Sequence, residues 1–187
     1  MKPSIDKNKL FMLVFVGSEA FFFIALIISY VYYSHPGGNL SATAKYLDFK
    51  KTLIFTFFLL TSSLTIWMAG LNQRKGNRKA LIGWLLVTII LGIVFLFGQG
   101  SEYERLISSN VTVSQNIFGS AFFTLTGFHG IHVILGLVVL SVMTLVIYSR
   151  KFEGVESKAL ESAAIYWHFV DAIWIVVFSV VYIGAII

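Results

Sequence analysis

Cysteine is absent from the sequence, which excludes a disulfide framework, a thiolate metal site and a cysteine nucleophile. Charged residues are scarce, at 12% of the 187 residues, whereas soluble domains contain about 25%. Internal repeats, low-complexity segments and a glycine-rich phosphate loop are also missing from the sequence. Hydrophobic and aromatic residues dominate instead, at 57% and 16%. This composition predicts an integral membrane protein.

The net charge is +5, because 14 lysine and arginine residues outnumber 9 aspartate and glutamate residues. A basic chain could bind nucleic acid. The basic residues of this chain, however, cluster beside apolar segments, where membrane topology explains them. We therefore expect no nucleic-acid partner.

Five segments are apolar over the roughly 20 residues that a helix needs to cross the hydrocarbon core of a bilayer. These predicted spans are residues 10–33, 53–71, 80–98, 117–148 and 163–187. The first follows a charged flank, as in a signal peptide, but no small-residue cleavage site follows it. The sequence therefore predicts an all-α, multi-pass membrane protein with five transmembrane helices in a single integral-membrane domain, residues 1–187.

Basic residues are distributed unequally between the two sides that five spans would create. The side of the N-terminus holds Lys2, Lys7, Lys9, Arg74, Lys75, Arg78, Lys79, Arg150, Lys151 and Lys158. The opposite side holds only Lys45, Lys50, Lys51 and Arg105. Since cytoplasmic loops carry the excess of Lys and Arg, we expect a cytoplasmic N-terminus and a C-terminus outside.

Five ionisable residues stand inside the predicted spans, namely Glu19, His129, His132, His168 and Asp171. Such a residue at a helix centre costs about 2.5–3.5 kcal/mol on insertion scales, so it usually faces the bundle interior and finds a partner. Glu19 and Asp171 lie at similar depths in helices that start from the same side. The two histidines of the fourth span are three residues apart, so they share one helix face. We therefore expect one buried cluster of carboxylates and imidazoles.

Three interpretations of this cluster stay open on the residues alone. The histidines could hold a metal ion or haem, if they converge from facing helices. The polar side chains could hydrogen-bond one another and hold the bundle together, as in ordinary transmembrane packing. They could also serve a proton-linked or lipid-contacting role in a larger assembly.

Several segments resemble subunit III of the haem–copper oxidases. They occur in that family's order across all five spans, and they read GSEAFFF, TSSLT, GQGSEYERL, FGSAFFTLTGFHGIHVILG and YWHFVDAIWIVVF. The family includes seven-helix forms, and this chain is similar to a shorter bacterial form that lacks the first two helices.

The resemblance implies a non-catalytic subunit without haem, copper or other metal of its own. It would pack directly against the catalytic subunit I within the membrane, beside other oxidase subunits that contain the haem and copper. The family's helices form two bundles around a lipid-filled cleft. Spans 1–2 would form one bundle here and spans 3–5 the other, with phospholipid in the cleft between them.

The resemblance also assigns residues by position. The membrane carboxylate is Glu19, the histidines of the fourth span are His129 and His132, and the last span supplies Trp167, His168 and Asp171. A Gln and Glu-Tyr pattern at the outer end of the third span falls on Gln99, Glu102 and Tyr103.

The function implied is support of O2 reduction and proton pumping by subunit I of a respiratory oxidase in the bacterial cytoplasmic membrane. Whether that oxidase takes electrons from cytochrome c or from quinol is set by other subunits. A nearer alternative is a similar accessory protein of a nitric oxide reductase system. A remoter one is a haem-bearing membrane cytochrome with His129, His132 or His168 as ligands.

Overall fold

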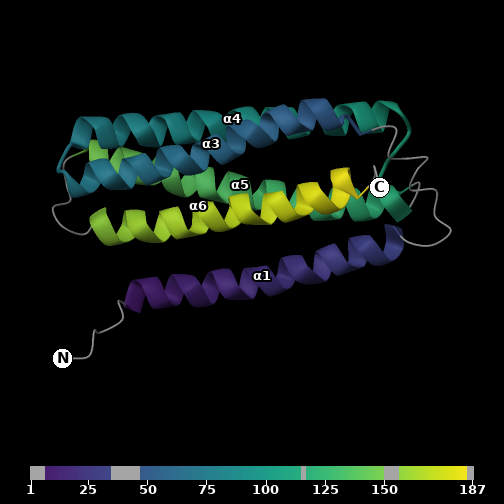
Figure 1. Cartoon of the computed structure of the whole chain (residues 1–187), viewed down its shortest axis with the longest axis horizontal. Helices are drawn as coiled ribbons and strands as arrows, with labels where there is room; N and C mark the ends of the chain where they lie inside the picture. The colour runs from purple at the N-terminus through teal and green to yellow at the C-terminus, as the bar shows by residue number, and fades with distance from the viewer. Residues whose placement is uncertain (1–6, 35–46, 115–116, 150–155, 185–187) are drawn as a thin grey trace.

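The computed structural model describes residues 7–34, 47–114, 117–149 and 156–184. Its helices are α1 (Lys7–Ser34), α3 (Phe49–Arg74), α4 (Arg78–Ser108), α5 (Ile117–Tyr148) and α6 (Glu156–Phe178), and a π-helical turn, η1 (Ser179–Ile183), continues α6 (Figure 1). All five long helices are long and apolar enough to cross a membrane. The all-α membrane class and the number of spans are confirmed.

Helix boundaries follow local capping signals rather than hydropathy alone. Asp48 caps α3 by accepting a hydrogen bond from the backbone N–H of Lys51 at 3.0 Å, and Asn77 caps α4 in the same way. α4 continues ten residues beyond the predicted end at residue 98, because its polar last turns still form helical hydrogen bonds. By contrast, α5 has the bounds predicted for the fourth span.

Some predicted positions lie outside the described residues. They are residues 185–187 of the last span and, among the basic residues counted for topology, Lys2, Lys45, Arg150 and Lys151. The orientation expected from the charges therefore stays a prediction.

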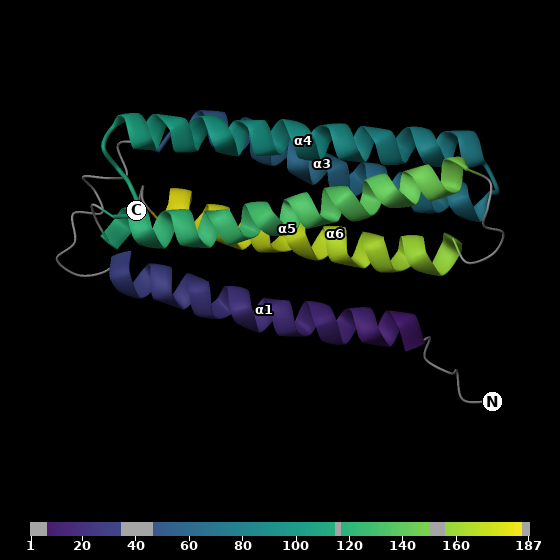
Figure 2. The same cartoon turned by 180° about the vertical axis from the view of Figure 1, so that it is seen from behind.

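The grouping of the helices differs from the expected pair of bundles. α1 packs mainly against α5 and α6, whereas α3 packs against α4 and α6, so spans 1–2 do not form a bundle of their own (Figures 1 and 2). A tight turn through Gly76, which has a φ of 68°, forces α3 and α4 to be antiparallel neighbours. Fourteen residues separate α1 from α3, so the chain is free to place α1 elsewhere.

Helix α6 contacts α1, α3 and α5, and α5 in turn contacts α1, α4 and α6. Its Trp167 is fully buried, and the indole ring lies close to one glycine of α4 and one of α5. A Cβ atom on Gly136 of α5 would lie 2.8 Å from the ring, and one on Gly92 of α4 would lie 2.9 Å from it. These two glycines therefore let α4 and α5 close around the tryptophan.

Helices α1 and α6 begin at the same end of the bundle (Figure 1). Lys9 near the start of α1 and Glu161 near the start of α6 form an ion pair at 2.8 Å. Polar residues at equal distances from these two starts can therefore share a depth in the membrane.

Candidate functional site

A carboxylate and an imidazole meet between α1 and α5. Glu19 Oε2 lies 3.0 Å from His132 Nε2, and the two side chains are 24% and 11% exposed. Of the two fourth-span histidines, His132 is the one that contacts this carboxylate in the structure.

The number of protons in this contact follows from the other ring nitrogen. His132 Nδ1 lies 2.7 Å from the carbonyl oxygen of Phe128. A carbonyl oxygen can only accept, so Nδ1 carries a hydrogen. One proton then remains between Nε2 and the Glu19 oxygen, as imidazolium beside carboxylate or as imidazole beside carboxylic acid. Either arrangement has no net charge, which suits a membrane interior.

Aromatic side chains enclose the pair. The ring of Phe23 lies edge-on to the imidazole of His132, with centroids 4.9 Å apart, and Phe22 packs edge-on against Phe128 at 5.1 Å. Tyr166 of α6 donates a hydrogen bond to the backbone carbonyl of His132 at 3.1 Å. Phe22 and Phe23 of the GSEAFFF segment thus pack beside the proton-sharing contact, while Tyr166 joins it to α6.

His129 does not join the carboxylate cluster that the sequence predicted. It is fully buried, and neither ring nitrogen has a hydrogen-bond partner among the described residues. Its ring lies 4.8 Å from that of Trp174 and 5.9 Å from that of Phe95. Positions three apart on a helix point about 60° apart, so His132 faces α1 while His129 faces α4 and α6. The prediction is wrong for His129.

Asp171 and His168 form a separate cluster with a residue of α3. The Ser63 hydroxyl donates to Asp171 Oδ2, and Ser63 Oγ lies 3.0 Å from His168 Nδ1. Asp171 is only 2% exposed, whereas His168 is exposed. In the part of the chain that the structure describes, neither residue has a hydrogen bond or ion pair with Glu19. The single cluster expected from the sequence is therefore two.

Hydroxyl groups of α3 are hydrogen-bond partners of α6 that hydropathy does not predict. Ser62 accepts a hydrogen bond from the Trp167 indole at 2.9 Å, and Thr56 accepts one from the Trp174 indole at 2.9 Å. A buried indole N–H needs an acceptor, especially in lipid. The tryptophans of the last span could therefore have been matched to the hydroxyls of the second.

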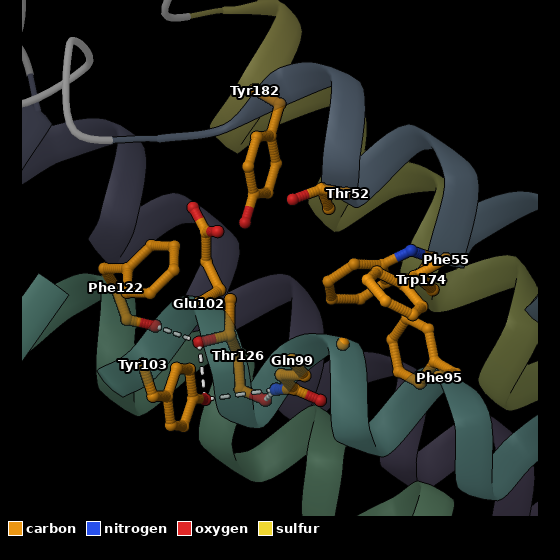
Figure 3. A pocket seen from close by; sticks show the side chains of 11 residues that line it. Thr52, Phe55, Phe95, Gln99, Glu102, Tyr103, Phe122, Thr126, Trp174 and Tyr182 are labelled. Atoms are coloured by element: carbon orange, nitrogen blue, oxygen red, sulfur yellow. Dashed lines mark hydrogen bonds between the residues drawn. The ribbon is translucent and has the colours of Figure 1, made fainter. Parts of the chain in front are cut away.

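The Gln99, Glu102 and Tyr103 positions do lie together, near the last turns of α4 (Figure 3). The Gln99 amide nitrogen donates to the carbonyl of Thr126 at 2.6 Å and to Tyr103 Oη at 3.1 Å. Tyr103 Oη also lies 2.8 Å from Thr126 Oγ1. These contacts tie the end of α4 to α5.

Glu102 joins α4 to α3. Its Oε1 accepts from the backbone N–H of Asp48 at 3.0 Å and from Arg105 at 2.5 Å, and Arg105 reaches the Asp48 carboxylate at 3.3 Å. The buried carboxylate therefore holds the start of α3 against the end of α4.

The three histidines in the described helices do not converge as a haem or metal site requires. His132 contacts Glu19, His168 contacts Ser63, and His129 stands among aromatic rings. Over the described ranges, no three His, Asp or Glu side chains are placed to hold a metal ion.

Comparison with known proteins decides between the remaining interpretations. The family model described as cytochrome c oxidase subunit III matches residues 4–186. The chain belongs to this family. As a member of the cytochrome c oxidase subunit III family, it is a subunit of a respiratory terminal oxidase.

Individual relatives agree with the family match. Cytochrome c oxidase subunit 3 of Corynebacterium diphtheriae is 33% identical over 173 residues, which cover 91% of this chain and 84% of that protein. Cytochrome bo(3) ubiquinol oxidase subunit 3 of Buchnera aphidicola is 34% identical over 189 residues and the full length of both. Cytochrome c oxidase subunit 3 of Osphranter robustus is 36% identical, over 96% of this chain and 71% of that protein.

These names bear on the alternatives. All three relatives are named as oxidase subunits, so the nitric oxide reductase alternative is not favoured. Two names specify cytochrome c and one specifies ubiquinol, so relatives of this subunit occur with both kinds of electron donor.

Proposed function

We propose that this chain is a non-catalytic subunit that supports O2 reduction and proton pumping by subunit I, against which it packs within the membrane. The observation that carries the proposal is that polar residues at the family's positions join helices of this chain to one another. Glu19 and His132 connect α1 with α5, and Asp171 connects α6 with α3 through Ser63. Haem and copper would then lie in the partner subunits, where electrons reach O2.

The proposed membrane is the bacterial cytoplasmic membrane, crossed by one integral-membrane domain with a cytoplasmic N-terminus and an external C-terminus. The positive-inside rule supports this orientation. Arg74, Lys75, Arg78 and Lys79 lie at or beside the α3–α4 turn, at the end of the bundle where α1 and α6 begin (Figure 1).

Phospholipid is proposed to bind in a groove between α1 and α5 rather than between the two bundles first expected. The groove has a volume of about 370 Å³ and lies where α1 ends and α5 begins. Leu26 and Leu125 line it with apolar surface, while Tyr33 and Thr124 add hydroxyls. Tyrosine is favoured at the membrane interface, and hydroxyls can donate to the ester or phosphate oxygens of a lipid.

Purification under mild detergent tests the assembly. A tagged chain should co-purify with subunits that contain haem and copper, whereas the chain produced alone should bind neither and consume no O2. O2 consumption by the isolated chain, or a Soret band that disappears when His129, His132 or His168 is replaced, would contradict the proposal.

A further inference from the structure

Asp171 is a buried carboxyl that the proposed support of subunit I leaves unexplained. It is 2% exposed, and its Oδ1 atom is buried with no hydrogen-bond partner among the described residues. Its Oδ2 atom accepts from the Ser63 hydroxyl. A membrane carboxyl without a cationic partner is costly in its charged form, so burial favours its protonated form. The Oδ1 atom has no hydrogen-bond partner among the described residues and can carry that proton.

Ser63 links this carboxyl to a groove on the surface. A hydroxyl has one hydrogen to donate and two lone pairs. Since that hydrogen goes to Asp171, the contact with His168 Nδ1 at 3.0 Å requires an N–H on the imidazole. His168 is itself exposed and lines a groove of about 250 Å³ between α3 and α6, together with Gln73, Arg74 and Glu161.

We infer that Asp171 is a proton-exchange site that communicates with the α3–α6 groove through Ser63 and His168. A proton from water in the groove binds His168 Nε2. The Nδ1 proton moves to Ser63 Oγ, and the Ser63 hydroxyl proton moves to Asp171 Oδ2. One proton has then crossed from the groove to the carboxyl, Ser63 is unchanged, and His168 is left neutral with its hydrogen on Nε2. The reverse transfers return the proton: the Asp171 carboxyl donates to Ser63 Oγ, the Ser63 hydroxyl proton moves back to His168 Nδ1, and the Nε2 proton is released to water in the groove.

Among the described residues, the Ser63 hydroxyl is the polar group that contacts the Asp171 carboxyl. From α3, the group that contacts it is the Ser63 hydroxyl, and on α6 itself the neighbouring titratable group is His168. Glu19 of α1 and His132 of α5 are occupied with each other. Trp167 uses the adjacent serine, Ser62, for its indole N–H, so the two neighbouring hydroxyls have separate partners.

Infrared spectroscopy of the full chain in lipid nanodiscs tests the inference. Comparison with Asp171→Asn identifies the carboxyl bands of Asp171, whose protonation is then followed after a rapid pH jump. Ser63→Ala and His168→Gln should each lower the rate of Asp171 protonation by about tenfold or more, because each variant removes one hydrogen-bonded step of the route. Ser63→Thr should restore the rate, because it keeps the hydroxyl.

Thr61→Ala is the matched control, since it removes a neighbouring α3 hydroxyl that bonds the Phe57 carbonyl of its own helix, and its rate should equal that of the unchanged chain. Equal rates in Ser63→Ala and the unchanged chain would overturn the inference. So would the absence of any Asp171 band change at every pH where the chain stays folded. Either result would leave the proposed support of subunit I standing, because that rests on assembly.

Discussion

The contact between Glu19 and His132 shows how a chain can keep two ionisable residues in a membrane without a net charge. The Phe128 carbonyl fixes one hydrogen on Nδ1, so the second ring nitrogen and the carboxyl share one proton. The proton can lie on either partner, and the contact between the helices persists in both cases.

Replacing Glu19 tests whether hydrogen bonding or charge holds α1. Glu19→Gln should leave the free energy of unfolding almost unchanged, because the amide N–H can donate to a neutral His132 Nε2. Glu19→Ala should lower it by about 1–3 kcal/mol, because it leaves a part-buried ring nitrogen without a partner. Urea unfolding of the chain in nanodiscs measures both. Ser18→Ala is the control, since Ser18 is exposed and bonds only its own helix, at the Phe15 carbonyl. An equal loss in Ser18→Ala and Glu19→Ala would refute the argument.

At the scale of helices, α6 is held by two kinds of contact. Hydroxyls of α3 accept the hydrogens of its indoles, and glycines of α4 and α5 admit the Trp167 ring. In lipid, burial of apolar area does not by itself drive helices together, so close packing and hydrogen bonds must do so. Trp167 makes both a hydrogen bond to α3 and close packing against the glycines.

Gly136→Ala tests the close packing. A Cβ would lie 2.8 Å from the Trp167 ring, which also lies close to Gly92 and whose nitrogen donates a hydrogen bond to Ser62. Overpacking of this kind costs about 1–3 kcal/mol, which should exceed the gain of up to about 1 kcal/mol from replacing a helical glycine by alanine. Thermal unfolding should show a lower midpoint. Gly83→Ala, which meets no atom within 4 Å, should leave the midpoint unchanged or raise it.

Arg105 tests the junction between α3 and α4. Removing it in Arg105→Ala leaves buried Glu102 with only the Asp48 N–H, so we expect a loss of about 1–3 kcal/mol in unfolding free energy. Amide hydrogen exchange in the first turn of α3 should accelerate. Glu104→Ala removes an exposed side chain of the same helix turn and should change neither quantity. Unaltered exchange in Arg105→Ala would show that the ion pair does not hold the start of α3.

For the whole molecule, hydropathy was sufficient to find five helices, because the thickness of the bilayer sets their length. Hydropathy could not predict how these helices pack against one another. The depth argument placed Glu19 beside Asp171, whereas the structure pairs Glu19 with His132 and Asp171 with Ser63, a hydroxyl that carries no strong hydropathy signal. The neighbours of α1 depended on loop lengths and on the hydrogen-bond needs of Tyr166 and the tryptophans, which one span's sequence does not reveal.

The orientation of the whole bundle rests on charge alone and is the prediction with the broadest consequence. A reporter that is active only outside the cytoplasm should be active when fused after Ile187 and inactive in the Asn72–Lys79 turn, while a reporter that needs the cytoplasm should show the opposite pattern. The physical reason is that the turn and its helix ends carry Arg74, Lys75, Arg78 and Lys79. Each of these positive charges disfavours translocation of the turn across the membrane. Replacing these four by glutamine should weaken the preference, whereas replacing Lys50 and Lys51 on the opposite side should strengthen it. Activity of the external reporter in the turn would show that the bundle has the opposite orientation. The α3–α6 groove would then open outside rather than toward the cytoplasm.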